Sequence, residues 1–324
     1  MKVFRSPAEI GPGFGPSVVA IGNFDGVHAG HRQIMRRVAA LARDRDCTPA
    51  ILTFDPHPAR VLAPERAPKL LMTIEQRLRA MESEGIEAVF LLPFSFEFAK
   101  LTPEEFAHSI LAQALHARII LVGDDFRFGY KQSGNVDTLR AVGQNLGFEL
   151  EAIPGVARRG NRISSSAIRA LVNAGAVSRA CRLLGKPFAL EGKVIPGQGI
   201  GSRQTVPTLN LDPLNEVLPR TGVYVTRTRD LDRVSDATRV WNSITNIGNR
   251  PTFNGDSLTI ETFLLDPLDD PTPVRIEVAF LKYLRDERKF ENPAALKSQI
   301  LKDVNVANRL HRRLAKLRME YPCI

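Results

Sequence analysis

The chain has 324 residues, of which 44% are hydrophobic and 24% are charged, an ordinary composition for a globular protein. At about 100–200 residues per domain, this length predicts two domains. Lysine and arginine outnumber aspartate and glutamate by 44 to 35, and the net charge of +9 favours anionic partners such as nucleic acids, acidic membranes or phosphorylated small molecules. The sequence has neither a signal peptide nor a run of about 18 apolar residues, so we expect a cytoplasmic protein without a membrane partner.

Short apolar segments alternate with amphipathic ones from residue 18 to about residue 185. The predicted strands cover residues 18–21, 50–54, 88–94, 118–122 and 148–153. The helices expected between them cover residues 31–43, 74–83, 103–115 and 136–146, and the third opens with the capping box Thr102-Pro103-Glu104-Glu105. This alternation predicts an α/β, Rossmann-like domain with a mostly parallel sheet covered on both faces. Ligands of such sheets bind at the carboxyl ends of the strands.

The pattern changes after Gly185, where strand-like segments follow one another with Pro and Gly turns between them. These segments cover residues 188–195, 222–229, 239–247, 257–265 and 274–284, and they predict a small antiparallel β-barrel or sandwich. A terminal helix is expected from Asn292-Pro293. Its predicted apolar stripe consists of Leu296, Ile300, Val304, Leu310, Leu314 and Leu317. We therefore expect two domains, residues 1–186 and 187–324.

The loop GNFDGVHAGH, residues 22–31, joins the first of these strands to the first helix. Such a loop presents free backbone N–H groups and the positive end of a helix dipole, so it attracts phosphate. Glycines at 22, 26 and 30 let the backbone approach a ligand closely, and His28 and His31 can point at one phosphate group. The loop matches neither GxxxxGK[ST] nor GxGxxG.

Two other interpretations of the loop are open. A zinc site could use His28 and His31 with Asp25 or His57, although the spacing of these histidines differs from the HExxH of metalloproteases. Alternatively, the histidines are ordinary solvated or core side chains. The position of the pair, where a doubly wound sheet binds nucleotides, favours the phosphate site.

Four motifs together give the first half of the chain a family resemblance: GNFDGVHAGH, TFDPHP (53–58), GDDFRFG (123–129) and ISSSAIR (163–169). They resemble the FMN adenylyltransferase (FAD synthetase) half of bacterial bifunctional riboflavin kinase/FAD synthetases. The resemblance implies that His28 and His31 hold ATP phosphates while Ser164, Ser165 and Arg169 close on them. The other residues that it assigns to nucleotide or flavin binding are Gly22, Asn23, Phe24, Asp25, Gly30, His57 and Asp125.

Some of these residues keep alternative roles, and two positions depart from the family. Asp25, His57 and Asp125 could orient the histidines or hold metal, and a capping or turn role is nearly as well supported for the aspartates. The family commonly has Asn at position 125 and Thr at position 166, where this chain has Asp125 and Ser166.

A second group of polar residues lies on the predicted strands of the second half. In TLNL (208–211) the period of two places Thr208 and Asn210 on one face, where a hydroxyl and an amide oxygen could coordinate Mg²⁺ or contact phosphate. The same pair could be the solvated face of a barrel strand. Glu261 lies in an otherwise apolar strand, where a half-buried carboxylate needs a partner or a task.

The motifs around these residues are similar to those of the riboflavin kinase domain, over residues 187–318: GVY (222–224), NIGNRPTF (246–253), Glu261-Thr262 and YLRDERKF (283–290). The resemblance implies that Thr208 and Asn210 hold Mg-ATP and that Glu261 takes the proton from the ribityl 5′-hydroxyl. It also implies nucleotide or flavin binding by Gly201, Arg203 and Asn246. The family pattern GRxLGxPTANL reads GSRQTVPTLNL here, so Ser202 replaces an Arg, and Arg203 can restore its charge one position later.

We therefore predict a bifunctional enzyme that converts riboflavin and ATP to FMN, and then FMN and a second ATP to FAD and pyrophosphate. Its expected ligands are ATP, flavins and Mg²⁺, with no nucleic-acid partner, and the sequence leaves a homo-oligomer open. One alternative is a nucleotidylyltransferase with another acceptor, such as phosphopantetheine or nicotinamide mononucleotide. The other is a tRNA enzyme of the HIGH type, against which the sequence has no KMSKS-like motif and no aromatic stacking series.

Overall fold

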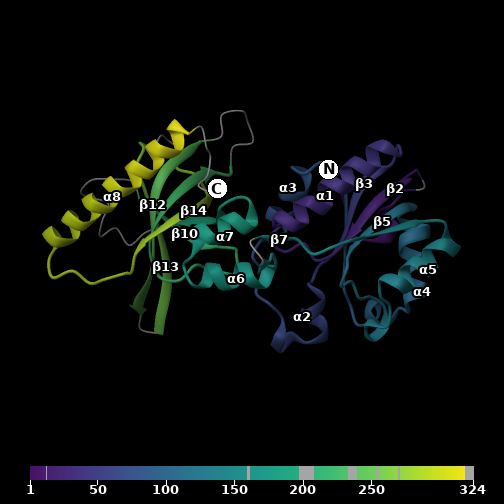
Figure 1. The fold of residues 1–324 in the computed structure, drawn as a ribbon. Coiled ribbons are helices and arrows are strands. Elements are labelled where there is room, and N and C mark those ends of the chain that lie inside the picture. The colour runs from purple at the N-terminus through teal and green to yellow at the C-terminus, as the bar shows by residue number, and fades with distance from the viewer. Residues whose placement is uncertain are drawn as a thin grey trace. The chain divides into compact units, whose positions relative to one another are not determined.

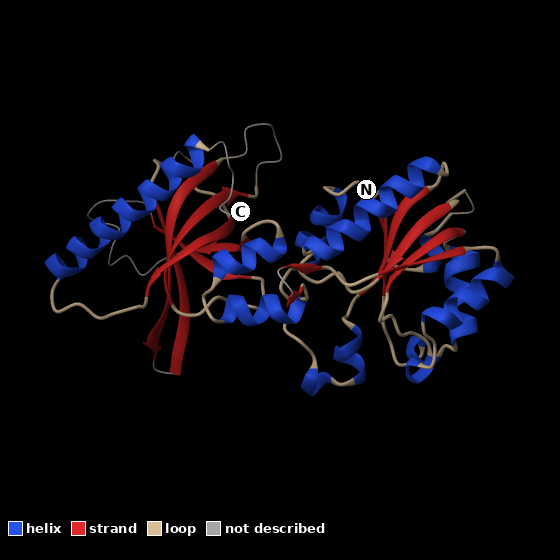
Figure 2. Ribbon diagram, in the orientation of Figure 1, coloured by secondary structure: helices blue, strands red, loops and turns tan. Residues whose placement is uncertain are grey.

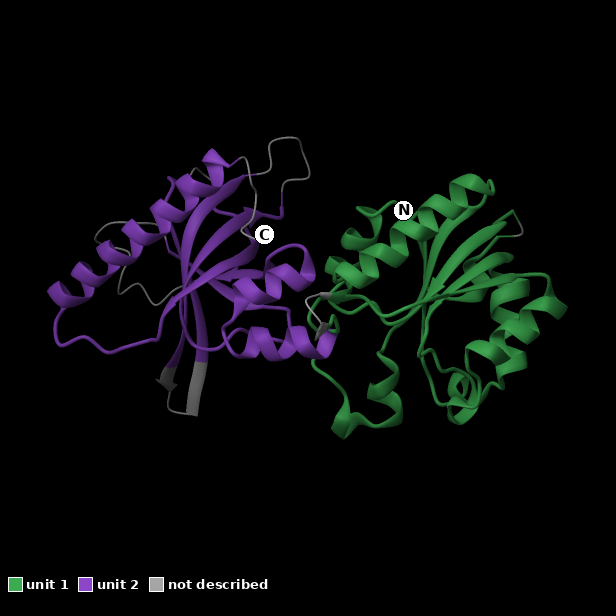
Figure 3. Cartoon of the chain, in the orientation of Figure 1, with its two compact units in different colours: residues 1–164 green, residues 165–324 purple. Residues whose placement is uncertain are grey.

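The structure is a computed structural model that describes residues 1–11, 13–158, 161–196, 208–232, 239–252, 255–268 and 271–317. The chain divides into two compact units, Met1–Ser164 and Ser165–Ile324 (Figure 3). The second unit begins with two short helices, α6 (Ser165–Asn173) and α7 (Val177–Leu184), and α7 packs against strands of the barrel described below. The predicted domain boundary at residue 186 would assign both helices to the first domain, and it stays a prediction.

The first unit contains a parallel sheet of six strands in the order β1-β4-β3-β2-β5-β6 (Figures 1 and 2). The strands are β1 (Lys2–Phe4), β2 (Ser17–Ile21), β3 (Thr48–Phe54), β4 (Ala88–Leu92), β5 (Ala117–Gly123) and β6 (Glu149–Ile153). The predicted α/β architecture is confirmed. The edge strand β1 was not predicted, because three residues are too few for a recognisable period. The predicted strand 88–94 ends at Leu92, just before Pro93.

Apart from short 3-10 helices, the helices of the first unit are α1 (Ala29–Asp44), α2 (Pro58–Leu62), α3 (Ile74–Glu82), α4 (Pro103–Phe106), the π-helix η4 (Ala107–Ala114) and α5 (Val136–Leu146). Buried apolar side chains form a separate cluster on each face of the sheet, as expected for a sheet covered by helices on both sides. The predicted helix 103–115 is continuous but widens into η4 after its first turn. The capping box between Thr102 and Glu105 is present. An antiparallel pair of two-residue strands, β7 (Ala157–Arg158) and β8 (Asn161–Arg162), follows β6.

The second unit is built around a closed antiparallel barrel in the order β10-β13-β12-β11-β14-β9. Its strands are β9 (Phe188–Ile195), β10 (Thr208–Pro213), β11 (Gly222–Asp230), β12 (Val240–Thr252), β13 (Gly255–Leu264) and β14 (Arg275–Arg285). The predicted barrel is therefore confirmed. Side chains alternate between its interior and its outer face, and α8 (Pro293–Lys316) covers part of the outside beside β12 (Figure 1).

The apolar stripe predicted for the terminal helix is only partly correct. Leu314 is buried, and Val304 and Leu310 pack against the cluster beneath the helix. The prediction is wrong for Leu296 and Leu317, since their side chains are 41% and 55% exposed. For Leu296 the physical reason is that the first turns of α8, residues 293–298, are exposed throughout, and contact with the barrel begins one to two turns later. Leu317 follows the last helical residue, Lys316, and is the C-cap of the helix. The buried positions of the helix are Asp303, Ala307, His311 and Leu314.

Candidate active sites

The turn between β2 and α1 has a strained backbone. Gly26 has φ +82°, a conformation that its lack of a Cβ allows, but Phe24 at +49° and Val27 at +37° also have positive φ. Non-glycine residues in this region cost on the order of 1–2 kcal/mol each, so the surrounding structure must hold the turn in place. Such strain is concentrated at binding and catalytic sites.

Buried polar contacts connect this turn to α3 and to the residues just before that helix. The Asp25 carboxylate accepts hydrogen bonds from the backbone N–H groups of Leu71, at 3.0 and 3.1 Å, and of Met72, at 3.3 Å. The Asn23 carbonyl oxygen accepts from Nη1 of Arg77 at 3.1 Å. Arg77 is buried on α3 and was missed in the sequence, where it is one cation among many on an amphipathic helix. Asp25 thus anchors the turn to the segment before α3.

His28 and His31 lie against each other at the start of α1. Nδ1 of His28 accepts from the backbone N–H of His31 at 3.3 Å, so His28 is the N-cap of the helix. The two imidazole rings stack with centroids 3.6 Å apart. A Cβ at Gly30 would lie 3.3 Å from the His28 ring, which explains the glycine between them. The structure thus brings the two predicted histidines together.

The electrostatic environment keeps both histidines neutral. Burial lowers the pKa of His28 from 6.5 to about 4. Burial also lowers the pKa of His31 well below its usual value, and a positive charge on His28 would lower it further. Because Nδ1 of His28 is an acceptor, we infer that the neutral ring carries its proton on Nε2 and can donate from there.

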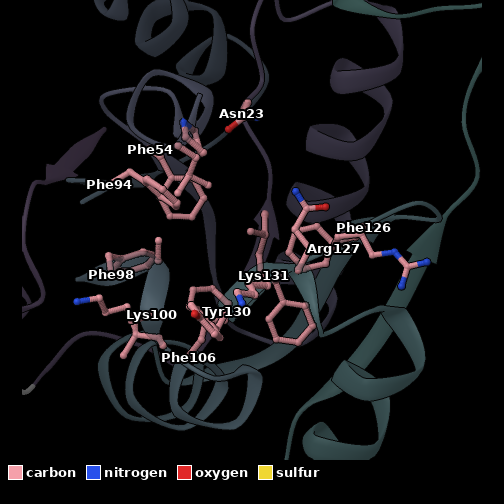
Figure 4. A pocket seen from close by; sticks show the side chains of 18 of the residues that line it. Asn23, Phe54, Phe94, Phe98, Lys100, Phe106, Phe126, Arg127, Tyr130 and Lys131 are labelled. Carbon is pink, nitrogen blue, oxygen red and sulfur yellow. The ribbon is translucent and has the colours of Figure 1, made fainter. Parts of the chain in front are cut away.

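A cavity of about 690 Å³ opens beside this turn, and the two share Ile21, Gly22 and Asn23 (Figure 4). Eight of its 21 lining residues are aromatic. They come from the end of β3, from α4 and from the segments after β4 and β5: Phe54, Phe94, Phe96, Phe98, Phe106, Phe126, Phe128 and Tyr130. Lys100, Arg127 and Lys131 add positive charge to the lining. The cavity thus joins an interior rich in aromatic side chains to the carboxyl end of β2, where the sheet was expected to bind its ligand.

Most of the aromatic lining was missed from the sequence. The run PFSFEF, residues 93–98, places three phenylalanines at alternate positions directly after a strand. This spacing is a signal, but a period of two with aromatic residues is equally typical of a strand, and Phe94 was assigned to one. Phe98 packs against rings from segments far apart in the chain, Phe54 and Phe106, whereas Phe96 is 60% exposed.

Asp125 lines the same cavity and forms an ion pair. Its carboxylate accepts from Nη2 of Arg162 at 2.8 Å, and Asp124 lies 3.5 Å from the same nitrogen. All three side chains are more than half exposed, so the pair contributes little stability. It does balance the charge at position 125, where the chain departs from the family that it resembles. The carboxylate therefore stands at the cavity with a cation beside it.

The remaining residues predicted for the first site lie at helix starts. His57 is the N-cap of α2, and its Nδ1 accepts from the backbone N–H of Ala59 at 3.2 Å. Ser164 directly precedes α6, which carries Ser165 and Arg169 in the second unit. Arg169 donates to the Ser166 hydroxyl at 3.1 Å. The predicted closing of Ser164, Ser165 and Arg169 on the ATP phosphates stays a prediction.

On the barrel, three predicted residues form one row across adjacent strands. Asn210 on β10 and Asn246 on β12 are both direct neighbours of Glu261 on β13. Residues opposite one another point to the same face of a sheet, with Cβ atoms about 5 Å apart, so the carboxylate lies between two amides. Thr208 shares this outer face at the start of β10 and is exposed. Gly201 and Arg203 lie outside the described residues.

Comparisons with known proteins agree with this arrangement. The FAD synthetase family model matches residues 14–167, and the riboflavin kinase family model matches residues 184–311. The bifunctional riboflavin kinase/FMN adenylyltransferase of Pseudomonas fluorescens is 36% identical over 311 residues, which cover 96% of this chain and 98% of the relative. Its counterpart in Escherichia coli K12 is 34% identical over 286 residues, or 88% and 90% of the two chains. The chain belongs to the bifunctional riboflavin kinase/FMN adenylyltransferase family.

The family predicted from the sequence is thereby confirmed, and the chain is an enzyme of flavin-cofactor synthesis that carries both a kinase and an adenylyltransferase domain. A crystal structure from Streptococcus pneumoniae, described as a macrolide-efflux protein, has the same fold with a TM-score of 0.83 and 29% identity. The match covers 94% of this chain and 98% of that one. In the part of this chain that the structure describes, no helix is long and apolar enough to cross a membrane.

Proposed function

We propose that the first site adenylylates FMN at the turn after β2 and that the second phosphorylates riboflavin on the outer face of the barrel. One observation carries the first assignment: the aromatic cavity reaches the carboxyl end of β2, and the turn that follows this strand carries His28 and leads to His31. A flat flavin and an anionic nucleotide would therefore lie next to each other there. The placement of Asn210 and Asn246 on either side of Glu261 supports the second assignment, riboflavin phosphorylation on the barrel.

The cavity suits the isoalloxazine ring of FMN. Planar aromatic ligands pack favourably against aromatic side chains, and about 690 Å³ falls within the usual range for sites of cofactor-sized ligands. The cations that line the cavity would favour FMN, which carries a phosphate, over uncharged riboflavin. We assign Asn23, Gly22 and Asp125 to the end of the cavity nearest the reacting phosphates.

Adenylyl transfer at this site needs no protein nucleophile. An oxygen of the FMN phosphate attacks the α-phosphorus of ATP, a new P–O–P bond forms, and the bond to the β-phosphate oxygen breaks as pyrophosphate leaves. The attacking group is already an anion, so the protein has to position the reactants and stabilise negative charge. The neutral imidazoles of His28 and His31 can donate hydrogen bonds to phosphate oxygens, and we propose that Ser164, Ser165 and Arg169 add further donors. Asp25 and His57 would position the turn and α2.

The kinase reaction starts from a neutral alcohol, so a base is useful. We propose that Glu261 accepts the proton of the ribityl 5′-hydroxyl as its oxygen attacks the γ-phosphorus of ATP. The bond between the γ-phosphorus and the bridging oxygen then breaks, and ADP leaves. Asn246 and Asn210, on either side of Glu261, would hold the carboxylate and the substrates in place.

Thr208 and Asn210 are the residues that would hold Mg²⁺ in this unit. A hydroxyl and an amide oxygen are hard oxygen donors, and both project from the outer face of β10. Mg²⁺ at kinase sites is usually bound through one or two protein oxygens together with substrate phosphates, so these two donors fit the ion. When bound, it would neutralise charge on the phosphates of ATP.

Incubation of the purified chain with riboflavin, ATP and Mg²⁺, followed by separation of the flavins, tests the assignment. FMN should appear first and FAD second. Glu261→Gln should stop FMN formation and spare the conversion of supplied FMN to FAD, whereas His31→Ala should do the reverse. If riboflavin and supplied FMN both stay unchanged with the unmodified chain, the proposed function is wrong. Equal loss of both reactions in either variant would contradict separate sites.

A second experiment tests the cavity. Phe98→Leu keeps an apolar side chain but removes an aromatic ring from the lining, so the KM for FMN in FAD formation should rise. The KM for riboflavin in the kinase reaction of the same protein is the control and should stay unchanged. A changed riboflavin KM with an unchanged FMN KM would contradict this location. The predicted cytoplasmic location, the absence of a nucleic-acid partner and a homo-oligomer stay predictions.

A further inference from the structure

The strained residue Phe24 lies between two anchored neighbours. The carbonyl oxygen of Asn23 accepts from Nη1 of Arg77 at 3.1 Å and from the Thr53 hydroxyl at 3.4 Å. On the other side of Phe24, the Asp25 carboxylate accepts from two backbone N–H groups just before α3. A peptide group is planar, so the direction of the Asn23 carbonyl also restricts the φ angle of the next residue. Arg77 and Thr53 thus help to keep Phe24 at its positive φ of +49°.

The helix that carries Arg77 is a firm support for this contact. α3 begins with a capping box, in which Thr73 and Gln76 each accept from the backbone N–H of the other, at 3.2 and 3.0 Å. One turn after Arg77, Ala80 and Met81 are buried in the same apolar cluster as residues of α1. The Arg77 side chain is itself buried. A buried side chain on a packed helix has little freedom, so Arg77 holds the carbonyl in one direction.

The Phe24 ring connects the anchored turn to His31. It meets the imidazole of His31 edge to face, with centroids 5.1 Å apart and an angle of 68° between the ring planes. The ring of His28 stacks on the same imidazole. Nδ1 of His31 is buried, and no residue that the structure describes forms a hydrogen bond with it. Since no hydrogen bond from Nδ1 orients the imidazole, its direction depends on packing against these rings.

We propose that Arg77 is a positioning residue for FMN adenylylation, which orients His31 through Asn23 and Phe24. The inference rests on the proposed function of the first site, in which His31 donates to ATP phosphates. Without the guanidinium, the peptide group after Asn23 can rotate, and Phe24 becomes more stable when it relaxes to a negative φ. Its ring then leaves His31, and the imidazole loses its direction towards the nucleotide.

Arg77→Met tests this proposal, because methionine is long and unbranched but has neither the charge nor the donor. We expect the KM for ATP in FAD formation to rise about tenfold, the factor that loss of one hydrogen bond to a charged phosphate produces. A purely structural role would instead reduce the fraction of folded protein, which lowers kcat and leaves this KM unchanged. Arg77→Lys keeps a charge and a donor and should restore part of the loss. The KM for ATP in riboflavin phosphorylation by the same protein should stay unchanged.

Two further variants complete the test. Phe24→Leu removes the ring that faces His31 and should also raise the KM for ATP in FAD formation, which keeps the inference testable if Arg77→Met fails to fold. Arg79→Met is the matched control, since Arg79 is an exposed arginine two residues further along α3 and should leave this KM unchanged. A wild-type KM for ATP in Arg77→Met or in Phe24→Leu, or an equal rise in the control, overturns the inference. Absence of FAD formation from supplied FMN by the unmodified chain would instead overturn the proposed function, and this inference with it.

Discussion

At the scale of single residues, His28 combines a structural role, as a helix cap, with a proposed role in ATP binding. Its Nδ1 caps α1, and its imidazole is a proposed donor to ATP. Asparagine is among the best N-cap residues but has no imidazole, so His28→Asn should abolish FAD formation at nearly wild-type stability. His28→Ala should lose both functions and cost about 1 kcal/mol of stability. Activity assays and denaturant unfolding of the two variants check this. Equal stability of the two variants would contradict the capping role.

From the lowered pKa of His28 we predict how the folding stability of the first unit changes as the pH falls. Above pH 6.5 the ring is neutral in both the folded and the unfolded chain, and the shift has no effect. As the pH falls from 6.5 towards about 4, the unfolded chain binds a proton that the folded chain excludes, so stability is lost over this range. Between pH 7 and pH 4.5 the wild type should lose about 2 kcal/mol more than His28→Asn.

Unfolding followed by far-ultraviolet circular dichroism measures this difference. Fluorescence of Trp241, the single tryptophan of the chain, reports the second unit and supplies the control. The tryptophan transition should have the same pH dependence in both proteins. If the wild type and His28→Asn lose stability in parallel, burial of a neutral His28 is not the source of the acid sensitivity.

Single residues could be predicted from the sequence where a local motif identifies them. His28, His31 and Gly26 lie within ten residues of one another, and their chemistry follows from the strand–turn–helix context. Arg77 and Phe54 could not be found in this way, because their roles depend on contacts with Asn23 and Phe98, from other parts of the chain. Charge or aromatic character alone does not distinguish such residues from their neighbours.

At the scale of the elements, five buried hydroxyls form a chain inside the barrel. Thr226 contacts the hydroxyls of both Ser243 and Thr245 at 2.8 Å. Thr228 extends the chain from Ser243, at 2.8 Å, and Thr262 extends it from Thr245, at 3.0 Å. All five side chains are fully buried, so each hydroxyl must be satisfied by its neighbours. The alternation of Thr with Val and Arg in GVYVTRTR would suggest a solvated face, although these threonines line the interior.

Removing the hydroxyl in the middle of this hydrogen-bonded series should lower the free energy of unfolding more than removing one at its end. Thr226→Val breaks two contacts and leaves hydroxyls on both sides short of a partner, so we expect a loss of about 2 kcal/mol. Thr228→Val breaks one contact and should cost about half as much. Denaturant unfolding followed by Trp241 fluorescence checks this order in the second unit. Equal losses of stability in the two variants would mean that the hydroxyl of Thr226 is no more important than that of Thr228, and would contradict the expected order.

Elements were predictable where apolar periodicity extends over several residues. The strands β2, β3 and β5 and the helices α1 and α5 agree with the sequence prediction to within a few residues. Strand β1 is too short for a period, and the π-helical turns of η4 have almost the same sequence pattern as an α-helix. In α8, Leu296 fits the predicted apolar stripe but stays 41% exposed, so the helical period alone does not show which turns of the helix pack against the barrel.

At the scale of the whole molecule, the two proposed sites lie in different units and share one intermediate. The His28–His31 pair and the aromatic cavity belong to unit 1, and the Glu261 row belongs to unit 2. FMN is the product of one reaction and the acceptor of the other. If FMN leaves the kinase site into solution before it is adenylylated, then two chains that each lack one activity should together make FAD.

A mixture of Glu261→Gln and His31→Ala should therefore convert riboflavin to FAD, although neither variant does so alone. The His31→Ala chain supplies FMN and the Glu261→Gln chain uses it, so FMN should accumulate first and FAD should follow after a lag. The lag should shorten as the protein concentration rises, because the intermediate diffuses between molecules. Separation of labelled flavins over time measures this, and excess unlabelled FMN should dilute the label in FAD. If the mixture makes FMN but no FAD, while Glu261→Gln alone still adenylylates supplied FMN, free release of the intermediate is wrong and FMN stays with the chain that made it.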